Sequence, residues 1–244
     1  MRNLKNSNQR HAYAHRHDHE QEESMTRALY LYGGWPGHSP YGVAEWMRTL
    51  LDGLGFEVEE SNDIFVLDQD LTGYDVILNN WNNALLSETL TASQESALLG
   101  AVEAGTGFVS WHGGGAAFRG SVMYHMMLGA DVFYHPAGEG VRHPYPLHVL
   151  DGSHPVTDGI EDFEAASEQY YMNVDPRNHV PLETVFDGQH MPWLAGQRMP
   201  QAWTKEWGAG RVFYSALGHY LEDLTAEPVE RLMRQGIVWA SRKH

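Results

Sequence analysis

The chain of 244 residues contains no cysteine, and this absence excludes several classes of site at once. Disulfide bonds, thiolate metal ligands and a cysteine nucleophile are all impossible. Long apolar runs are missing too, since no stretch approaches the roughly 20 residues that a membrane-spanning helix needs. The polar N-terminal residues show no apolar signal segment, so the cytoplasm is the expected location.

Basic residues are scarce: 16 lysines and arginines stand against 32 aspartates and glutamates, giving a formal net charge of −16. A nucleic-acid partner is therefore not expected, because phosphate binding requires a basic face. An anionic membrane surface is disfavoured for the same reason. The charge places little restriction on a neutral ligand such as a sugar, and a chain of this length can bury a substantial core.

Residues 1–24 differ from the rest of the chain because they are polar and lack hydrophobic periodicity. They include His11, His15, His17 and His19. We predict a disordered, histidine-rich tail whose metal binding is adventitious. Residues 25–244 contain no repeat and no clear linker, which predicts one α/β domain.

The first half of that domain alternates apolar strands with amphipathic helices. Strands are predicted at residues 28–32, 56–60, 74–81 and 107–111, and helices at 41–54 and 91–104. Thr91 and Gln94 have the spacing of a capping box. Further strand-like runs occupy residues 147–150, 184–186, 201–205 and 211–214, before a last helix at 225–240. The order predicts a flavodoxin-like, mostly parallel sheet with helices on both faces.

Unusual residues follow three of the predicted parallel strands. The first strand leads to Trp35 and His38, the third to Asn80 and Trp81, and the fourth to His112 and three glycines. Ligands of open α/β sheets bind beyond the carboxyl ends of the strands, which share one edge. We therefore expect these residues to converge on a site.

His112 stands between an apolar strand and a glycine run, in the stretch FVSWHGGG. Gly113 and Gly114 would let the backbone approach a ligand closely, although a tight turn without function is equally compatible. His219 follows another strand and Gly218, which repeats this arrangement. An imidazole suits proton transfer near neutral pH and also ligates metals, so both roles stay open for His112.

Other side chains add polar and aromatic groups to the predicted site. Glu168, next to Gln169 and Tyr170, is a general base or metal ligand, with a solvated surface carboxylate as the alternative. Arg119 orients a substrate oxygen or forms a structural ion pair, and His135 is a substrate contact or a turn residue. Tryptophan rings suit stacking on sugar rings, although core packing is their commoner role.

Several stretches together resemble a known family. They include YGGWPGHSP, NNWNN, FVSWHGGGAAFRG, SEQYYMNVDP and GRVFYSALGH, in an order that extends from Ala28 to Ala240. The chain is similar to the ThuA-like (trehalose-utilisation) family, whose fold is related to class I glutamine amidotransferases. The resemblance implies that His112 occupies the nucleophile elbow, where those amidotransferases carry a cysteine. Glutamine hydrolysis through a thiolate is excluded here.

The resemblance also implies a role with trehalose or a related disaccharide, including 3-keto forms supplied by a partner sugar oxidoreductase. We predict a hydrolase or isomerase that uses acid/base or metal-assisted chemistry. The alternative is a non-catalytic sugar-binding or regulatory module. Oligomeric state is left open, with a homo-oligomer among the options.

The residues predicted to carry this function fall into two groups. The catalytic residues are His112, Glu168, His38 and His219, which would also be the ligands if a divalent metal, zinc first, takes part. No other cofactor is implied. Predicted substrate contacts are Trp35, Asn80, Trp81, Gly113, Gly114, Arg119, His135, Gln169 and Tyr170.

Overall fold

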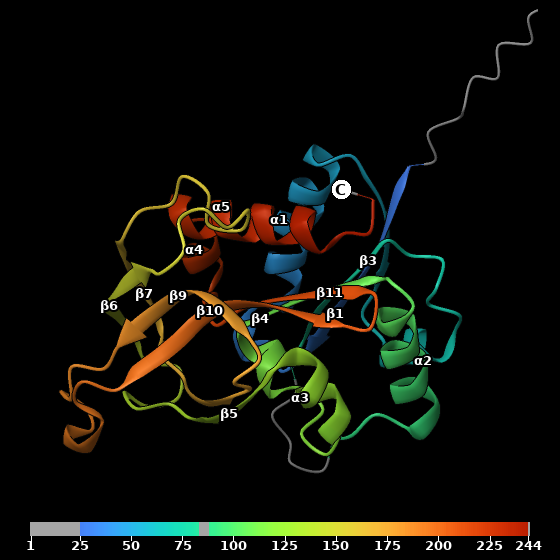
Figure 1. The fold of residues 1–244 in the computed structure, drawn as a ribbon. Helices are drawn as coiled ribbons and strands as arrows, with labels where there is room; N and C mark the ends of the chain where they lie inside the picture. Colours follow the sequence, from blue (N-terminus) through green and yellow to red (C-terminus); the bar gives the residue numbers. More distant parts are fainter. Residues whose placement is uncertain (1–24, 83–87, 244) are drawn as a thin grey trace, which may run out of the picture.

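The computed structural model describes residues 25–82 and 88–243 of the chain. The predicted tail, residues 1–24, lies outside the described residues. Five parallel strands form the centre of the main sheet (Figure 1): β2 (Phe56–Ser61), β1 (Thr26–Gly34), β3 (Val76–Asn82), β4 (Gly107–Trp111) and β11 (Gly210–Ser215). The predicted flavodoxin-like α/β class, with a central parallel sheet, is confirmed.

Four antiparallel strands extend this sheet beyond β11. In order they are β10 (Arg198–Trp207), β9 (His179–Val185), β6 (Arg142–Val149) and β7 (Phe163–Glu168). Each reverses the direction of its neighbour, so β7 runs the same way as β11. A separate two-stranded sheet pairs β5 (Ala130–Tyr134) with β8 (Tyr171–Val174).

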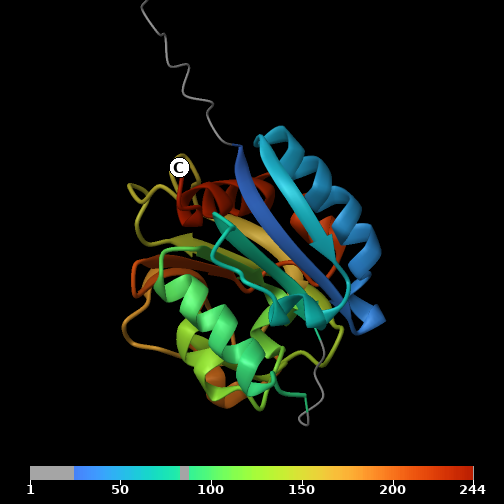
Figure 2. The same cartoon turned by 90° about the vertical axis from the view of Figure 1, so that its right-hand side faces the viewer.

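Helices cover both faces of the central sheet. Figures 1 and 2 show α1 (Pro40–Gly53) and α5 (Glu227–Ala240) on one face, and α2 (Ala92–Glu103) and α3 (Val122–Leu128) on the other. The short helices are α4 (Leu221–Leu224), η1 (Pro36–His38), η2 (Ile64–Asp68), η3 (His112–Ala116) and η4 (Pro192–Leu194). No helix among the described residues is both long enough and apolar enough to cross a bilayer.

The alternation of side chains along β1 explains why both faces need helices. Ala28 and Tyr30 enter the core under α1 and α5, while Leu29 and Leu31 enter the core under α2 and α3. All four are almost fully buried. Successive residues of a strand point to opposite faces, so a strand that is apolar at every position must be covered on both.

The predicted capping box at the start of α2 is confirmed. The Thr91 hydroxyl accepts the backbone N–H of Gln94 at 3.2 Å, and the Gln94 side-chain oxygen accepts the Thr91 N–H at 3.0 Å. These bonds satisfy two of the backbone donors that a helix start leaves open. The capping box therefore defines the start of α2, the helix that connects β3 to β4.

Asp75, at the start of β3, is a buried carboxylate whose loss is expected to destabilise the fold. It accepts the Arg27 N–H at 2.9 Å and pairs with Arg242 at 3.3 Å and Lys243 at 3.0 Å. Burial acts to raise its pKa, but these partners outweigh burial and hold the pKa below the usual value. Asp75→Asn is expected to lower the free energy of unfolding by about 1–3 kcal/mol at pH 7.

The same substitution has a predictable pH dependence. Because the pKa of Asp75 is lower in the folded chain, its contribution is complete above the unfolded pKa of about 3.9 and is lost as pH falls through the folded pKa. Urea unfolding of both proteins at pH 7 and pH 3 should show a smaller difference at pH 3. An equal difference at the two pH values would contradict this account.

Candidate active site

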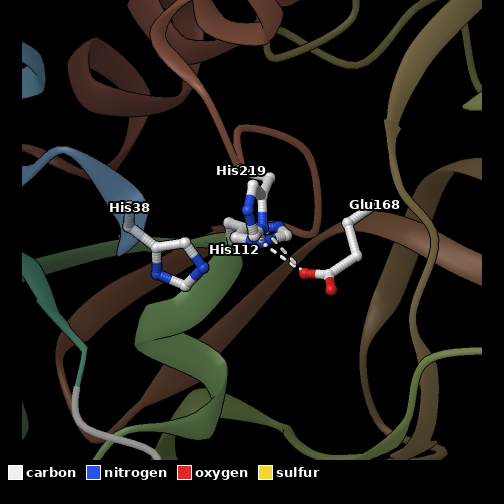
Figure 3. Close-up of side chains that lie close together, drawn as sticks. All are labelled: His38, His112, Glu168 and His219. Atoms are coloured by element: carbon white, nitrogen blue, oxygen red, sulfur yellow. Dashed lines mark hydrogen bonds and ion pairs between the residues drawn. The ribbon is translucent and has the colours of Figure 1, made fainter. Parts of the chain in front are cut away.

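Four predicted residues lie together at one edge of the main sheet. His38 ends η1 after β1, His112 begins η3 after β4, and His219 follows β11. Glu168 is the last residue of β7, which runs in the direction of β11 and so ends at the same edge. Figure 3 shows the four side chains pointing toward one another from these separate segments.

Three side-chain atoms of this cluster form a small triangle. Glu168 Oε2 lies 3.1 Å from His112 Nε2 and 2.8 Å from His219 Nδ1, and the two nitrogens lie 3.0 Å apart. A nitrogen of His38 completes a set of four atoms that all lie within 4.8 Å of one another. His112, Glu168 and His219 are each no more than 2% exposed.

The backbone fixes which nitrogen of His112 faces this triangle. His112 Nδ1 lies 2.9 Å from the carbonyl oxygen of Ala216, which can only accept a hydrogen bond. Nδ1 therefore carries the hydrogen, and the neutral ring presents the Nε2 lone pair to Glu168 and His219. The Tyr170 hydroxyl, 2.8 Å away, donates to that Nε2.

The pKa shifts within the cluster favour neutral imidazoles and an ionised carboxylate, which are the protonation states that bind cations. Burial lowers the pKa of His112, and burial together with the neighbouring His112 and His219 lowers the pKa of His38 to about 2. Burial acts to raise the pKa of Glu168, but the close imidazoles of His112 and His219 outweigh burial and hold that pKa below its usual value. At neutral pH, His38 and His112 are therefore neutral and the carboxylate is ionised.

The backbone at His112 is in the left-handed region, with φ of 40°. A non-glycine residue held there costs on the order of 1–3 kcal/mol, and such strain is concentrated at functional sites. The following glycines are needed for space: a Cβ on Gly114 would overlap the Ser110 hydroxyl, and one on Gly115 would overlap the Tyr214 hydroxyl. The turn thus projects the imidazole of His112 from a closely packed base.

A second layer of contacts holds Glu168 and His219. The other carboxylate oxygen of Glu168 accepts the Gly140 N–H at 2.5 Å and lies 3.7 Å from His135 Nε2. Ser167, next to Glu168, donates to Asp223 at 2.7 Å and accepts the Gly218 N–H, next to His219, at 3.4 Å. One hydroxyl therefore ties the end of β7 to the loop after β11.

The cavity at this cluster is small, about 30 Å³. That is roughly the volume of one water molecule in the liquid. Of the predicted substrate contacts, Trp35, Arg119, His135 and Tyr170 line it. Two larger hollows, of about 460 and 500 Å³, lie beside Trp239, and neither contains such a cluster within the described chain.

Other predicted contacts lie elsewhere. The Asn80 amide faces the Tyr30 hydroxyl at 3.5 Å, and the Trp81 indole donates to Glu88 at 3.2 Å. The Gln169 amide lies 3.4 Å from the Thr184 hydroxyl. None of these side chains, nor Gly113 or Gly114, is among the described residues that line the cavity.

Three residues line the cavity without having been predicted: Asn82, Ala116 and Glu139. Asn82 is the last residue of β3, which extends one residue past its predicted end, and its amide contacts the His38 ring. The repeated asparagines of NNWNN were the available signal for it. Glu139 lies in a loop whose sequence has no pattern that would single it out.

Gly113 packs against the His38 ring. A larger residue at position 113 should displace His38 without removing any side chain of the cluster. A Cβ at Gly113 would overlap the Asn82 amide and lie 2.7 Å from His38 Cε1. If this cluster holds zinc, Gly113→Ala is expected to weaken zinc binding about 10- to 100-fold, the usual effect of disturbing the contacts that position a metal ligand. Titration calorimetry measures this, with Gly100→Ala in α2 as the control because its Cβ meets nothing within 4 Å. Equal zinc affinity in both variants would contradict the role of His38.

Comparison with known proteins decides the family. The family model for ThuA, described as trehalose utilisation, matches residues 27–240. The chain belongs to the ThuA family. This confirms the resemblance seen in the sequence. None of the curated proteins matches the chain at a significant level.

Solved structures agree with the ThuA fold. A ThuA-like protein of Parabacteroides merdae matches with a TM-score of 0.73 and 19% identity over 88% of this chain and 90% of its own. One of Bacteroides uniformis matches with a TM-score of 0.72 and 20% identity, over 88% and 91%. A glutamine amidotransferase of Thermotoga maritima has a TM-score of 0.52 and 10% identity, over 79% and 75%. At these identities the likeness establishes the fold alone.

Proposed function

We propose that this ThuA-family protein is a metal-dependent enzyme that hydrolyses or isomerises trehalose, a related disaccharide or its 3-keto derivative. The observation that carries the proposal is the triangle of His112 Nε2, His219 Nδ1 and Glu168 Oε2, with sides of 2.8–3.1 Å. Two atoms bonded to one ion at about 2.0–2.2 Å are roughly 2.8–3.1 Å apart when the bonds are perpendicular, as on an octahedral face, and roughly 3.3–3.6 Å apart at the tetrahedral angles of zinc. The triangle thus has the dimensions of an octahedral face and would open by a few tenths of an ångström around a tetrahedral ion.

The donor set also fits such an ion chemically. Imidazole nitrogens and one carboxylate suit zinc and related divalent metals. His112 Nδ1–H donates to the Ala216 carbonyl, and metal-binding histidines are commonly oriented by such a bond from their other ring nitrogen. A bound divalent ion would supply Lewis-acid polarisation of a carbonyl oxygen and a water of lowered pKa.

Residues around the cavity would bind and orient the substrate. Trp35, which is 39% exposed, stands at the rim and offers a ring face to a sugar. Tyr170 and His135 line the wall next to Glu168, and the Tyr170 hydroxyl, which donates to His112 Nε2 without an ion, would turn to a substrate hydroxyl once an ion takes that lone pair. Because the cavity has a volume of only about 30 Å³, only the reacting end of a sugar enters it in this conformation.

A sugar-binding or regulatory module is the alternative function, and turnover separates the two. The full chain, carrying asparagine in place of His11, His15, His17 and His19, would be analysed for bound metal, so that tail histidines do not contribute. It would then be incubated with trehalose, other disaccharides and their 3-keto forms, and products followed by mass spectrometry and NMR. Metal-dependent conversion of one of these sugars supports the enzyme. Saturable sugar binding with no conversion supports the module.

A further inference from the structure

Arg119 carries a mostly buried guanidinium that has no close acceptor among residues 25–82 and 88–243. Its side chain is 20% exposed and lines the cavity of the histidine cluster. Its nearest acid is Asp131, whose Oδ1 lies 4.0 Å from Arg119 Nη1 and whose side chain is 42% exposed. Among the described residues, both Arg119 Nε and Asp131 Oδ1 are buried atoms without a hydrogen-bond partner.

The buried cation Lys205 is paired much more closely. Its Nζ lies 2.7 Å from Asp175 Oδ2. Burying an N–H donor such as that of Arg119 Nε without an acceptor is unfavourable. Within the described part of the chain, Arg119 therefore has the donors of an anion site but not the acceptor.

We propose that Arg119 anchors a carboxylate of the substrate, so that the site acts on a sugar acid. This inference rests on the metal site and the reaction class of the proposed function, and it replaces the neutral sugars considered there with disaccharide-derived sugars that carry a carboxylate. A carboxylate is planar and matches the fork of a guanidinium through two parallel hydrogen bonds. It is also compact enough to enter a cavity of about 30 Å³ in part.

The charges around the cavity make this binding depend on the metal. The formal charges of Glu139, Glu168 and Arg119 leave the lining one charge negative, and a divalent ion makes it one charge positive. An anionic ligand is therefore repelled by the metal-free site and attracted by the loaded one. Arg119 then supplies the selectivity for a carboxylate over a neutral hydroxyl.

The test compares D-gluconate with D-glucitol, two probes of equal chain length that differ by one carboxylate. Titration calorimetry on the zinc-loaded full chain is expected to show at least about tenfold tighter binding of gluconate. Arg119→Met is expected to lower gluconate affinity about 10- to 100-fold, the effect of losing hydrogen bonds to a charged group, and to leave glucitol affinity and zinc content unchanged. Arg119→Lys should retain part of the preference.

The control is Arg48→Met, which removes the same charge from an exposed ion pair with Glu60. It should bind both probes like the unsubstituted chain. Equal gluconate affinity in the zinc-loaded Arg119→Met and Arg48→Met proteins would overturn the anchor and leave the metal site standing. A protein that takes up no zinc but still binds gluconate through Arg119 would overturn the metal site and leave the anchor standing.

Discussion

Replacing His112 by alanine is expected to lower turnover by at least about a thousandfold. Losing a side chain that only supports a metal ligand typically lowers metal affinity or activity 10- to 100-fold, and this substitution removes a proposed ligand atom itself. His112 Nε2 belongs to the triangle with Glu168 and His219, and no other described side chain within that triangle can replace it. Steady-state kinetics with the converted sugar, together with zinc titration, measure the loss.

The stability cost of the same substitution should be modest. It leaves the Ala216 carbonyl without its donor, for a cost of about 1–3 kcal/mol, and it keeps the strained backbone at residue 112. His125→Ala is the matched control, because His125 is also a largely buried histidine that donates through Nδ1 to a backbone carbonyl, that of Ala130. Normal turnover in His112→Ala would remove His112 from the chemistry.

Removing the metal is expected to abolish activity and to lower the melting temperature by about 8–16 °C. An ion that binds only the folded chain stabilises it by about 4 kcal/mol at a free concentration 1,000 times its Kd. For a chain of this size, 1 kcal/mol shifts the melting temperature by about 2–4 °C. Thermal melts with a chelator, and after zinc is restored, measure both effects on the variant with substituted tail histidines.

Glu168→Gln provides the internal comparison for this experiment. The amide has nearly the same shape as the carboxylate but no charge, so zinc should raise its melting temperature far less. Glu168 is 2% exposed and is the only carboxylate among the four residues of the cluster. Its replacement by glutamine therefore removes the only negative charge that the cluster offers to an ion. A chelator that leaves both the activity and the melting temperature unchanged would rule out the metal.

The parallel half of the fold could be predicted because each strand there is followed by a helix. His38 and His112 were found through that order, since both follow apolar strands that share an edge. His219 was found because Gly218 and His219 repeat the arrangement after β11. Their convergence is therefore a consequence of parallel topology, which local sequence patterns report well.

The antiparallel half was predicted in part: the runs at residues 147–150, 184–186 and 201–205 fall on β6, β9 and β10, but β7 was missed and the pairing of these strands is non-local. Pro144 and Pro146 argue against a strand, yet β6 includes both, and its ladder register with β9 pairs His148 and Val149. Glu168 was a candidate from its neighbours in sequence, but the strand β7 that positions it was not predicted. Arg119 shows a further limit: its missing acceptor is visible only once burial is known.

The position of β11 has a consequence for how the protein is made. β11 lies between β4 and β10, although it is the last strand of the chain. On the ribosome, His38, His112 and Glu168 emerge first, but the strand that joins the two halves of the sheet does not yet exist. Ala216, which orients His112, and His219 arrive only after β11. The nascent chain must therefore insert a central strand late, and the four-residue cluster is complete only after His219 has been made.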